Sequence, residues 1–351
     1  MITITDLPNV RYPIVQAPML GVTTPAMVAA ASNAGILGSL PVGGLSPERT
    51  LELIKTTKLL TGKSFSVNLF AHGPAKHVDE HEIDLMQDFL TQLCAGFHIP
   101  YQRQDINAMR FYFYEEQVQL LIDEKIPVVS FTFGMLTNEV INAFKKNGTV
   151  LIGTATSIAE AKALANAGVD AIAVQGIEAG GHRGSFLPEE NLPQIGLFSL
   201  LPQIAPEVDL PLLAAGGIYN AKTMKAAFDL GASAVQVGSP FIVADESAVC
   251  EAHKTEILNV TDTSTALTRA FSGRWARGIQ NEFMRQMSAS GLNIPYYTYQ
   301  NSLTAGMRAY AQQYNLKDFI SLWAGQSAGN SKRGSTKKIA MWLIEEFEKI
   351  S

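Results

Sequence analysis

Near the middle of the chain lies the segment Ala171-Ile172-Ala173-Val174-Gln175-Gly176-Ile177-Glu178-Ala179-Gly180-Gly181-His182-Arg183-Gly184. Its first five residues are typical of a buried strand, and from Gly176 onward it contains four glycines, a carboxylate, an imidazole and a guanidinium. Glycine allows a backbone to approach a ligand closely and to aim N–H groups at an anion, and histidine exchanges protons near neutral pH. We interpret the segment as a strand followed by the active-site loop of a barrel enzyme.

Short apolar runs like 171–175 recur along the chain and alternate with amphipathic, helix-type segments. Several of these runs are apolar at consecutive positions, as expected of strands buried on both faces of a parallel sheet. The eight predicted strands are residues 14–17, 36–40, 65–70, 128–133, 150–153, 171–175, 212–215 and 234–238. The helix-type segments between them include residues 24–33, 47–57, 138–146, 157–167 and 221–230.

Glycines mark the ends of the predicted helices, one or two residues past the last apolar position. They are Gly35, Gly62, Gly148, Gly168 and Gly231. A glycine at such a position adopts the left-handed conformation that turns the chain back toward the next strand. Eight strand-helix units within roughly 240 residues predict an α/β fold of the TIM (β/α)8 barrel type, for which ~250 residues are typical. A doubly wound open sheet is the alternative topology.

The composition is that of a globular protein of 351 residues, of which 47% are hydrophobic and 17% are charged. Its net charge of −5 provides no surplus of basic residues for a nucleic-acid backbone, so nucleic acid is not an expected partner. The two cysteines, Cys94 and Cys250, lack the spacing of a disulfide framework or a thiolate metal site. Because no stretch approaches the ~20 apolar residues of a membrane span and the N-terminus carries no targeting pattern, we expect a cytoplasmic protein without a membrane partner.

Three parts of the chain depart from the simple barrel pattern. Residues 71–127 form an insertion that is longer than one crossover needs, and we expect part of it to cover the barrel mouth. Residues 245–303 are largely helix-type and polar, and they predict a smaller, mainly helical cap domain. Residues 304–351 are again helix-type and are expected to pack back on the barrel, whose own domain is then residues 1–244.

The seventh and eighth predicted strands both end in glycines. In a TIM barrel, the loops after these two strands often bind a phosphate. Gly216 and Gly217 follow the seventh strand, and Gly238 and Ser239 follow the eighth, so backbone N–H groups and a hydroxyl are available for a phosphate monoester. Each glycine alone would be explained equally well as a plain turn. The chain has no P-loop pattern, and no Gly-x-Gly-x-x-Gly follows the first strand.

Carboxamides and a flat wall extend this predicted phosphate site. Asn68, Gln175 and Gln236 lie at strand ends, and an uncharged amide that both donates and accepts suits the ribityl hydroxyls and ring edge of a flavin. The segment 16–19 closes the first strand and offers a wall for an aromatic ring. FMN is therefore the predicted cofactor. Its predicted binding residues are Ala17, Pro18, Met19, Asn68, Gln175, Gly180, Gly181, Gly216, Gly217, Gln236, Val237, Gly238 and Ser239.

No metal site is predicted. His77-Val78-Asp79-Glu80-His81 fits the His-x-x-Glu-His pattern of some zinc proteases. The string lies in a very polar segment and has no evident third ligand. We interpret it as the solvated start of a helix.

Six motifs, taken in chain order, resemble those of the nitronate monooxygenases, formerly called 2-nitropropane dioxygenases. The most specific is Glu178-Ala179-Gly180-Gly181-His182-Arg183-Gly184, and the others are residues 16–19, 67–70, 130–134, 214–218 and 236–239. The similarity continues to Ser321-Leu322-Trp323-Ala324-Gly325-Gln326, so it covers nearly the whole chain. It implies an FMN-binding TIM barrel with a cap domain that oxidises alkyl nitronates with O2 to a carbonyl compound and nitrite. Propionate 3-nitronate is the expected substrate, and detoxification is the expected role.

The resemblance also implies roles for single residues. His182 would lie over the flavin and act as a general base toward a neutral nitroalkane, or hold an anionic nitronate. Arg183 would attract the anion or pair with Glu178, and the sequence leaves both roles open.

Two residues are expected at the substrate pocket. Some relatives carry a histidine where this chain has Thr132, and a hydroxyl cannot replace the basicity of that imidazole, so the substrate range is open. Tyr299 belongs to a tyrosine cluster with Tyr296 and Tyr297 and is expected to line the pocket from the cap side.

Two other functions are compatible with the sequence. An FMN-dependent enoyl-acyl-carrier-protein reductase shares the barrel and a similar Gly-Gly-His loop, but it needs NAD(P)H and an acyl groove. A non-catalytic flavin-binding protein is the second alternative. Arg183 after the histidine and the string 322–326 favour the nitronate reaction. The sequence does not determine the oligomeric state, and a homodimer is compatible with it.

Overall fold

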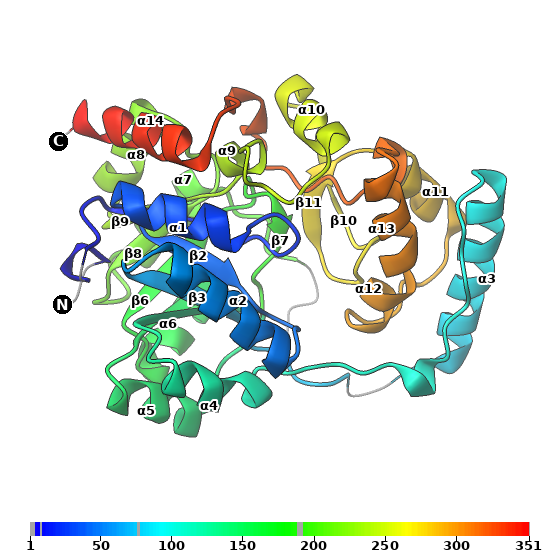
Figure 1. Ribbon diagram of the computed structural model, residues 1–351, viewed down its shortest axis with the longest axis horizontal. Coiled ribbons are helices and arrows are strands. Elements are labelled where there is room, and N and C mark those ends of the chain that lie inside the picture. The colour runs from blue at the N-terminus through cyan, green and yellow to red at the C-terminus, as the bar shows by residue number, and fades with distance from the viewer. Residues whose placement is uncertain (1–3, 8, 76–77, 188–191, 351) are drawn as a thin grey trace.

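Eight parallel strands form the centre of the structure, a computed structural model that describes residues 4–7, 9–75, 78–187 and 192–350 (Figure 1). They follow one another in the order β1-β9-β8-β6-β5-β4-β3-β2. The barrel strands are β1 (Ile14–Gln16), β2 (Gly38–Pro41), β3 (Phe65–Phe70), β4 (Val128–Thr132), β5 (Val150–Ala155), β6 (Ala171–Gln175), β8 (Leu212–Ala215) and β9 (Ala234–Val237).

The two ends of this strand order meet. The Gln16 amide donates to the Leu37 carbonyl at 2.9 Å, and the Leu37 amide donates to the Ile14 carbonyl at 3.0 Å. These bonds join β1 to the segment that leads into β2, so the sheet curls into a barrel. The TIM barrel prediction is confirmed, and the open doubly wound sheet is excluded.

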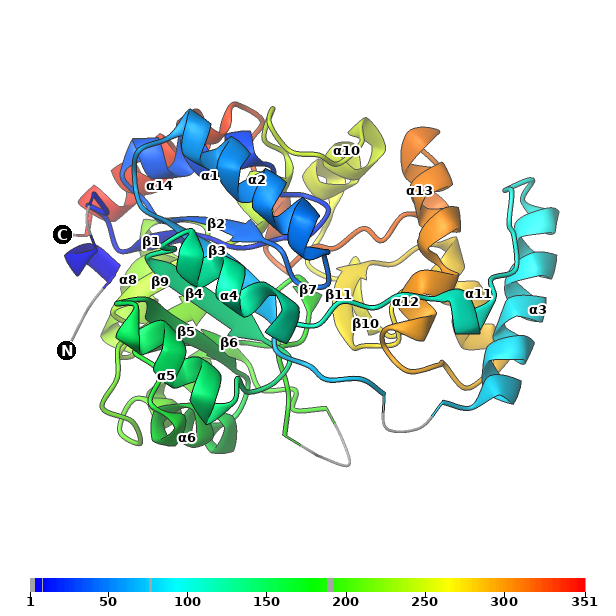
Figure 2. The ribbon, with the colours of Figure 1, turned by 60° about the horizontal axis from the view of Figure 1, so that its bottom comes forward.

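Eight helices surround the barrel, one after each strand, as the doubly buried strands predicted (Figure 2). They are α1 (Pro25–Ala34), α2 (Pro47–Leu60), α4 (Glu115–Asp123), α5 (Asn138–Lys146), α6 (Ile158–Ala167), α7 (Leu197–Ile204), α8 (Ala221–Asp229) and α14 (Thr336–Glu348). The last of these, α14, is separated from β9 by about a hundred residues of sequence and nevertheless packs against α1 and α8. It occupies the place of the eighth barrel helix.

Local capping explains where several of these helices begin and end. The side chains of Thr24, Ser46 and Ser157 each accept a hydrogen bond from a backbone amide in the first helical turn. At the other end, Gly35 and Gly168 are left-handed caps with φ of 96° and 87°. Gly148 and Gly231 also have positive φ, but Gly62 does not, because α2 ends at Thr61 in an extended conformation. The prediction for Gly62 was wrong.

A second group of helices and strands lies beside the barrel and has its own apolar core. Its elements are α3 (Glu80–Gly96), α10 (Glu251–Asn259), β10 (Thr265–Thr268), β11 (Ala276–Ile279), α11 (Glu282–Ser290), α12 (Tyr299–Leu303) and α13 (Ala305–Gln313), and the short α9 (Ser239–Ile242) connects it to β9. Met86 and Leu90 of α3 share this core with Phe283 of α11 and Met307 of α13. The shared core shows that the insertion helix α3 packs on the cap.

We propose domain boundaries that follow these two cores. Because α13 contributes to the second core, the cap extends from residue 245 to about 335, rather than to 303, and also includes α3. Of the helices in the predicted C-terminal segment, α14 is the one that packs against the barrel helices α1 and α8. The described part of the chain contains no helix with the length and apolar character needed to span a membrane.

A three-stranded antiparallel sheet joins the barrel to the cap, which had been expected to be mainly helical. Its order is β10-β11-β7, and β7 (Gly181–His182) belongs to the glycine-rich loop after β6. In this sheet Ala276 pairs with His182 and Arg277 with Gly181. The sheet therefore fixes the loop between the two parts of the molecule (Figure 1).

Candidate active site

A cavity of about 730 Å3 lies between the carboxyl ends of the barrel strands and the cap. This volume lies within the range typical of small-molecule sites. All but one of the residues predicted to bind cofactor or substrate line it. They are Ala17, Pro18, Met19, Asn68, Thr132, Gln175, Gly180, Gly181, His182, Gly216, Gly217, Gln236, Val237, Gly238 and Ser239. The exception is Tyr299, which packs edge-on against Phe111 with ring centroids 5.1 Å apart.

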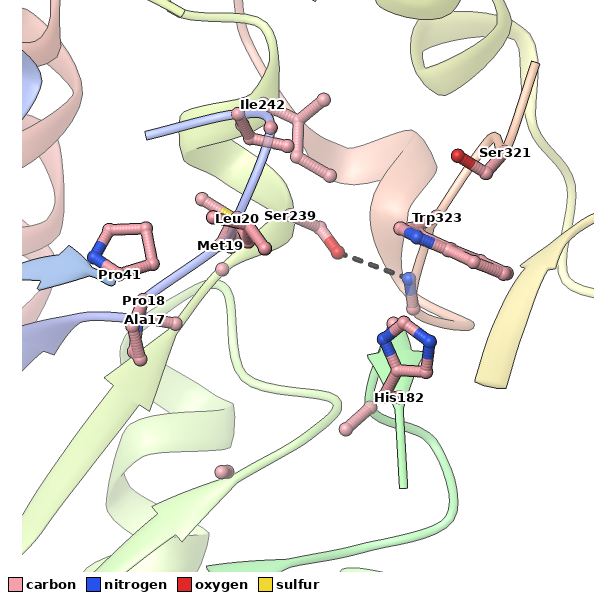
Figure 3. Close-up of a pocket in the computed structure, with 18 of the residues that line it drawn as sticks. Ala17, Pro18, Met19, Leu20, Pro41, His182, Ser239, Ile242, Ser321 and Trp323 are labelled. Carbon is pink, nitrogen blue, oxygen red and sulfur yellow. Dashed lines mark hydrogen bonds between the residues drawn. The ribbon is translucent and has the colours of Figure 1, made fainter. Parts of the chain in front are cut away.

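His182 points into this cavity from the short strand β7 (Figure 3). Trp323 lies beside its ring, with centroids 5.3 Å apart, and Ala17 and Met19 lie on the opposite side of the pocket. The amide of Gln175 holds the loop, because its Nε2 donates to the His182 carbonyl at 3.0 Å and its Oε1 accepts from the Gly184 amide at 2.8 Å. Gln175 therefore lines the cavity but uses both amide atoms to position the loop.

The imidazole of His182 is neutral at physiological pH. Burial, together with the positive charges of Arg274 and Arg308, lowers its pKa to about 3. Its Nε2 lies 2.7 Å from the hydroxyl of Ser272, which in turn contacts the backbone of Arg274. The ring is thus held at one nitrogen while it faces the cavity.

Arg183 faces away from the cavity. It is only 1% exposed, and it donates from Nη1 to the Gly176 carbonyl at 2.6 Å and from Nη2 to the Gln175 carbonyl at 3.0 Å. Glu178 instead accepts the Leu197 amide at the start of α7, at 2.8 and 3.0 Å. Neither of the two roles left open for Arg183, an anion site or an ion pair with Glu178, is observed. Arg183 supports the end of β6.

Glycine is required at several places around the cavity. Gly216 and Gly217 have φ of 120° and 70°, a region that favours glycine. A Cβ on Gly180 would lie 2.5 Å from the backbone of Ala324 and Gly325, so the loop packs closely on the chain that follows Trp323. In the described part of the chain, the amides of Gly216, Gly217 and Gly238 donate to no protein acceptor. These donors are available to a ligand in the cavity, and we refer to the three amides together as the anion cradle.

Two predicted carboxamides keep polar atoms free toward the cavity. Asn68 donates from Nδ2 to the Ser130 hydroxyl at 3.0 Å, which leaves its Oδ1 unused. Gln236 makes no side-chain hydrogen bond to the described protein. The hydroxyl of Ser239 accepts the Gly325 amide at 3.2 Å, which is the bond drawn in Figure 3.

Aromatic side chains surround His182 on the cap side. Within the tyrosine cluster, the residue that lines the cavity is Tyr297 rather than the predicted Tyr299. Its ring centroid lies 6.1 Å from that of His182. Phe133 completes the group at 5.6 Å from His182, and its φ of 75° is unusual for a bulky residue. Thr132 precedes it on the cavity wall, next to Gly184.

Sequence reasoning missed most of the cavity residues that come from the cap, among them His253, Asn301, Arg308 and Gln312. A weak signal was present in α13, where Ala305, Arg308, Ala309 and Gln312 recur at helical spacing and so share a face. The sequence of α13 alone does not indicate which part of the molecule this face contacts. The zinc-like string is only partly described, because His77 lies outside the described residues, and Asp79 caps the start of α3.

His253 gives a prediction for acid stability. Burial lowers its pKa to about 4, so between pH 4 and 6.5 the unfolded chain binds a proton that the folded chain does not. Its stabilising contribution is complete above pH 6.5 and is lost toward pH 4, by roughly 3 kcal/mol. His253→Gln is therefore expected to reduce the slope of unfolding free energy against pH between pH 4 and 6.5, by the equivalent of about one bound proton. Urea unfolding at several pH values measures this slope. His81→Gln, on the exposed start of α3, is the control, and equal slopes in wild type and His253→Gln would contradict the prediction.

A TIM barrel that presents free backbone amides and an imidazole to one cavity is typical of an enzyme that acts on a small molecule. Within that class, the chain belongs to the nitronate monooxygenase family, whose family model matches residues 2–346. It is 38% identical over 348 residues to a probable nitronate monooxygenase of Staphylococcus aureus strain Newman, covering 99% of this chain and 97% of the relative.

Solved structures agree with this family. Nitroalkane oxidase from Streptomyces ansochromogenes superposes with a TM-score of 0.91 and 34% sequence identity, covering 99% of both chains. FabK from Thermotoga maritima superposes less well, with a TM-score of 0.76 and 28% identity, covering 99% of this chain and 97% of that chain. The chain is an enzyme of the nitronate monooxygenase family, and its predicted membership is confirmed.

Proposed function

We propose that this enzyme binds FMN in the cavity and oxidises alkyl nitronates with O2 to a carbonyl compound and nitrite. Propionate 3-nitronate is the proposed physiological substrate, and detoxification in the cytoplasm is the proposed role. The proposal is carried by one observation, which is that the His182 imidazole and the anion cradle of Gly216, Gly217 and Gly238 face the same cavity. Family membership supports the reaction class.

The residues of the cavity fit the proposed cofactor. The free amides of the anion cradle match a phosphate monoester, because a fixed set of N–H donors binds an anion without a counter-charge. Ala17, Pro18 and Met19 provide a wall for the flavin ring, and the free amide atoms of Asn68 and Gln236 suit its polar groups. When bound, FMN supplies the electron acceptance and the reaction with O2.

The electrostatics of His182 favour nitronates over neutral nitroalkanes. A general base works best when its pKa is near the operating pH, and the pKa of His182 is lowered to about 3. Removal of a proton from a neutral nitroalkane is therefore weakly driven. A nitronate has already lost that proton, so His182 needs only to orient it by hydrogen bonding.

Ser272 is expected to position this imidazole. It is 2% exposed, and its hydroxyl lies 2.7 Å from His182 Nε2. Ser272→Ala removes one buried hydrogen bond, which corresponds to about 1 to 1.5 kcal/mol, and should lower kcat for a nitronate by roughly tenfold without changing FMN content. Steady-state kinetics measure this effect, with Ser288→Ala on the exposed side of α11 as the control. A kcat equal to that of the control would remove Ser272 from the site.

The proposed reaction is tested by measuring oxygen uptake and nitrite release together. Purified enzyme reconstituted with FMN should consume O2 and release nitrite when propionate 3-nitronate is added, with no need for NADH or NADPH. Oxidation of NADH without nitrite release would contradict the proposal and favour the enoyl-acyl-carrier-protein reductase alternative. Absence of both reactions in FMN-loaded protein would favour a non-catalytic flavin-binding protein.

A further inference from the structure

The cavity wall contributed by the cap contains a cation with an unused donor. Arg308 of α13 lines the cavity and is half-buried. Its Nε donates to the Thr304 hydroxyl at 3.1 Å, and its Nη2 donates to the carbonyl and the side-chain oxygen of Asn301 at 2.7 and 2.9 Å. Across the described residues, Nη1 has no hydrogen-bond acceptor. The guanidinium is therefore held in one orientation with one end free.

No carboxylate neutralises this cation. Among the residues that the structure describes, no acidic oxygen lies within 4 Å of Arg308, as it would in an ion pair. The one carboxylate on the described cavity wall is that of Glu178, which is occupied by the Leu197 amide. Charged groups removed from water are normally paired, so an unpaired guanidinium at a cavity is suited to an anion that comes from outside.

The other buried arginines near the site differ from Arg308. Arg183 and Arg277 donate to backbone carbonyls of the loop after β6, and Arg274 donates to the Ser185 carbonyl at 2.6 Å. These three arginines therefore satisfy buried backbone carbonyls that would otherwise need water as a hydrogen-bond donor. Arg308 has no loop carbonyl to satisfy apart from that of Asn301 in its own segment.

Arg308 is also separate from the anion cradle. The cradle comes from the loops after β8 and β9 of the barrel, whereas Arg308 comes from α13 of the cap, which faces the barrel (Figures 1 and 2). Arg308 lowers the pKa of His182, which places the two groups within electrostatic reach of each other. The pKa of Arg308 itself is lowered by burial to about 10, so the guanidinium stays charged at neutral pH.

We propose that Arg308 determines specificity by binding a carboxylate at the far end of the substrate, so that the preferred substrates are nitronates that carry a second negative charge. This inference rests on the proposed function. Because His182 is neutral, it provides hydrogen bonding but no net attraction for an anion. A carboxylate at Arg308 Nη1 makes a charge-assisted hydrogen bond, which holds the nitronate end near His182.

The test compares two nitronates of equal chain length. Propionate 3-nitronate has a carboxylate where propyl-1-nitronate has a methyl group. Arg308→Gln should lower kcat/KM for propionate 3-nitronate by about 10- to 100-fold, mainly through KM, and change that for propyl-1-nitronate by less than about threefold. Arg308→Lys should keep part of the preference because it keeps the charge. Arg285→Gln, an exposed arginine of α11, is the matched control. Flavin content and the unfolding midpoint of each variant report whether the fold is intact.

Binding of succinate provides a readout that does not depend on turnover. This dicarboxylate has nearly the length of propionate 3-nitronate, and calorimetry on the FMN-loaded enzyme should show binding that Arg308→Gln weakens at least tenfold and Arg285→Gln leaves unchanged. Oxidation of both nitronates with equal kcat/KM in wild type and Arg308→Gln would overturn the inference while leaving the proposed function intact. If no nitronate is oxidised but succinate binding depends on Arg308, the anion site stands and the proposed reaction is wrong. Succinate binding that is absent or independent of Arg308 would also overturn the inference.

Discussion

His182→Asn is expected to lower turnover of neutral nitroalkanes by at least about 100-fold while leaving the FMN content unchanged. General base catalysis contributes about 10² to 10⁴ in rate, and the low pKa of His182 places its contribution at the lower end of this range. An amide cannot accept the proton at all. Asparagine matches the imidazole only as far as Nδ1, so the variant also loses the contact between His182 Nε2 and the Ser272 hydroxyl, which is 2.7 Å in the wild type. The cofactor should be retained because most of its proposed binding groups, among them the anion cradle, belong to other loops of the barrel.

The same variant separates the two substrate classes. A nitronate needs no proton removed, so its turnover should fall by only about tenfold in His182→Asn, as in Ser272→Ala. Oxygen uptake with matched pairs of nitroalkane and nitronate measures both effects, and His81→Asn on the exposed start of α3 is the control. Nitroalkane turnover equal to that of wild type would remove His182 as the base.

Arg183→Met is expected to lower the free energy of unfolding by about 3 to 6 kcal/mol, because it removes two buried hydrogen bonds from a charged donor, each worth about 1.5 to 3 kcal/mol. Methionine fills much of the volume but leaves the carbonyls of Gly176 and Gln175 without donors in a position where Arg183 is 1% exposed. Urea or guanidinium unfolding of the FMN-free protein measures the change.

Two further variants keep this prediction testable if Arg183→Met does not fold. Arg183→Lys keeps the charge but cannot reach both carbonyls with a planar fork, so an intermediate loss is expected. Arg285→Met, at an exposed arginine, should change stability by less than about 1 kcal/mol. A stability of Arg183→Lys equal to that of wild type would show that the two carbonyl contacts contribute little.

The barrel could be predicted from the sequence because its signals are local. Strands buried on both faces give continuous apolar runs, and left-handed glycines such as Gly35 and Gly168 end the helices between them. The position of the cavity could be predicted as well, because the carboxyl ends of parallel strands all lie on one side of the barrel. Gly216, Gly217 and His182 could therefore be placed together without knowledge of the cap.

The cap could not be predicted to the same detail because its contacts are between distant segments. The strands β10 and β11 are four residues each, too short for a clear alternating pattern, and they are stabilised by pairing with each other and with β7. Tyr297 rather than Tyr299 reaches the cavity because α12 begins at Tyr299, which turns that ring toward Phe111. Arg183 was left open for the same reason, since its partners are backbone carbonyls that no side-chain pattern reveals.

The most direct test of the account is the flavin absorption spectrum of the FMN-loaded enzyme during an anaerobic titration. Propionate 3-nitronate is expected to bleach the flavin band without NADH, and admission of air is expected to restore the band and release nitrite. The account would be contradicted by purified protein that cannot be loaded with FMN, or by a loaded enzyme whose flavin band does not change when the nitronate is added.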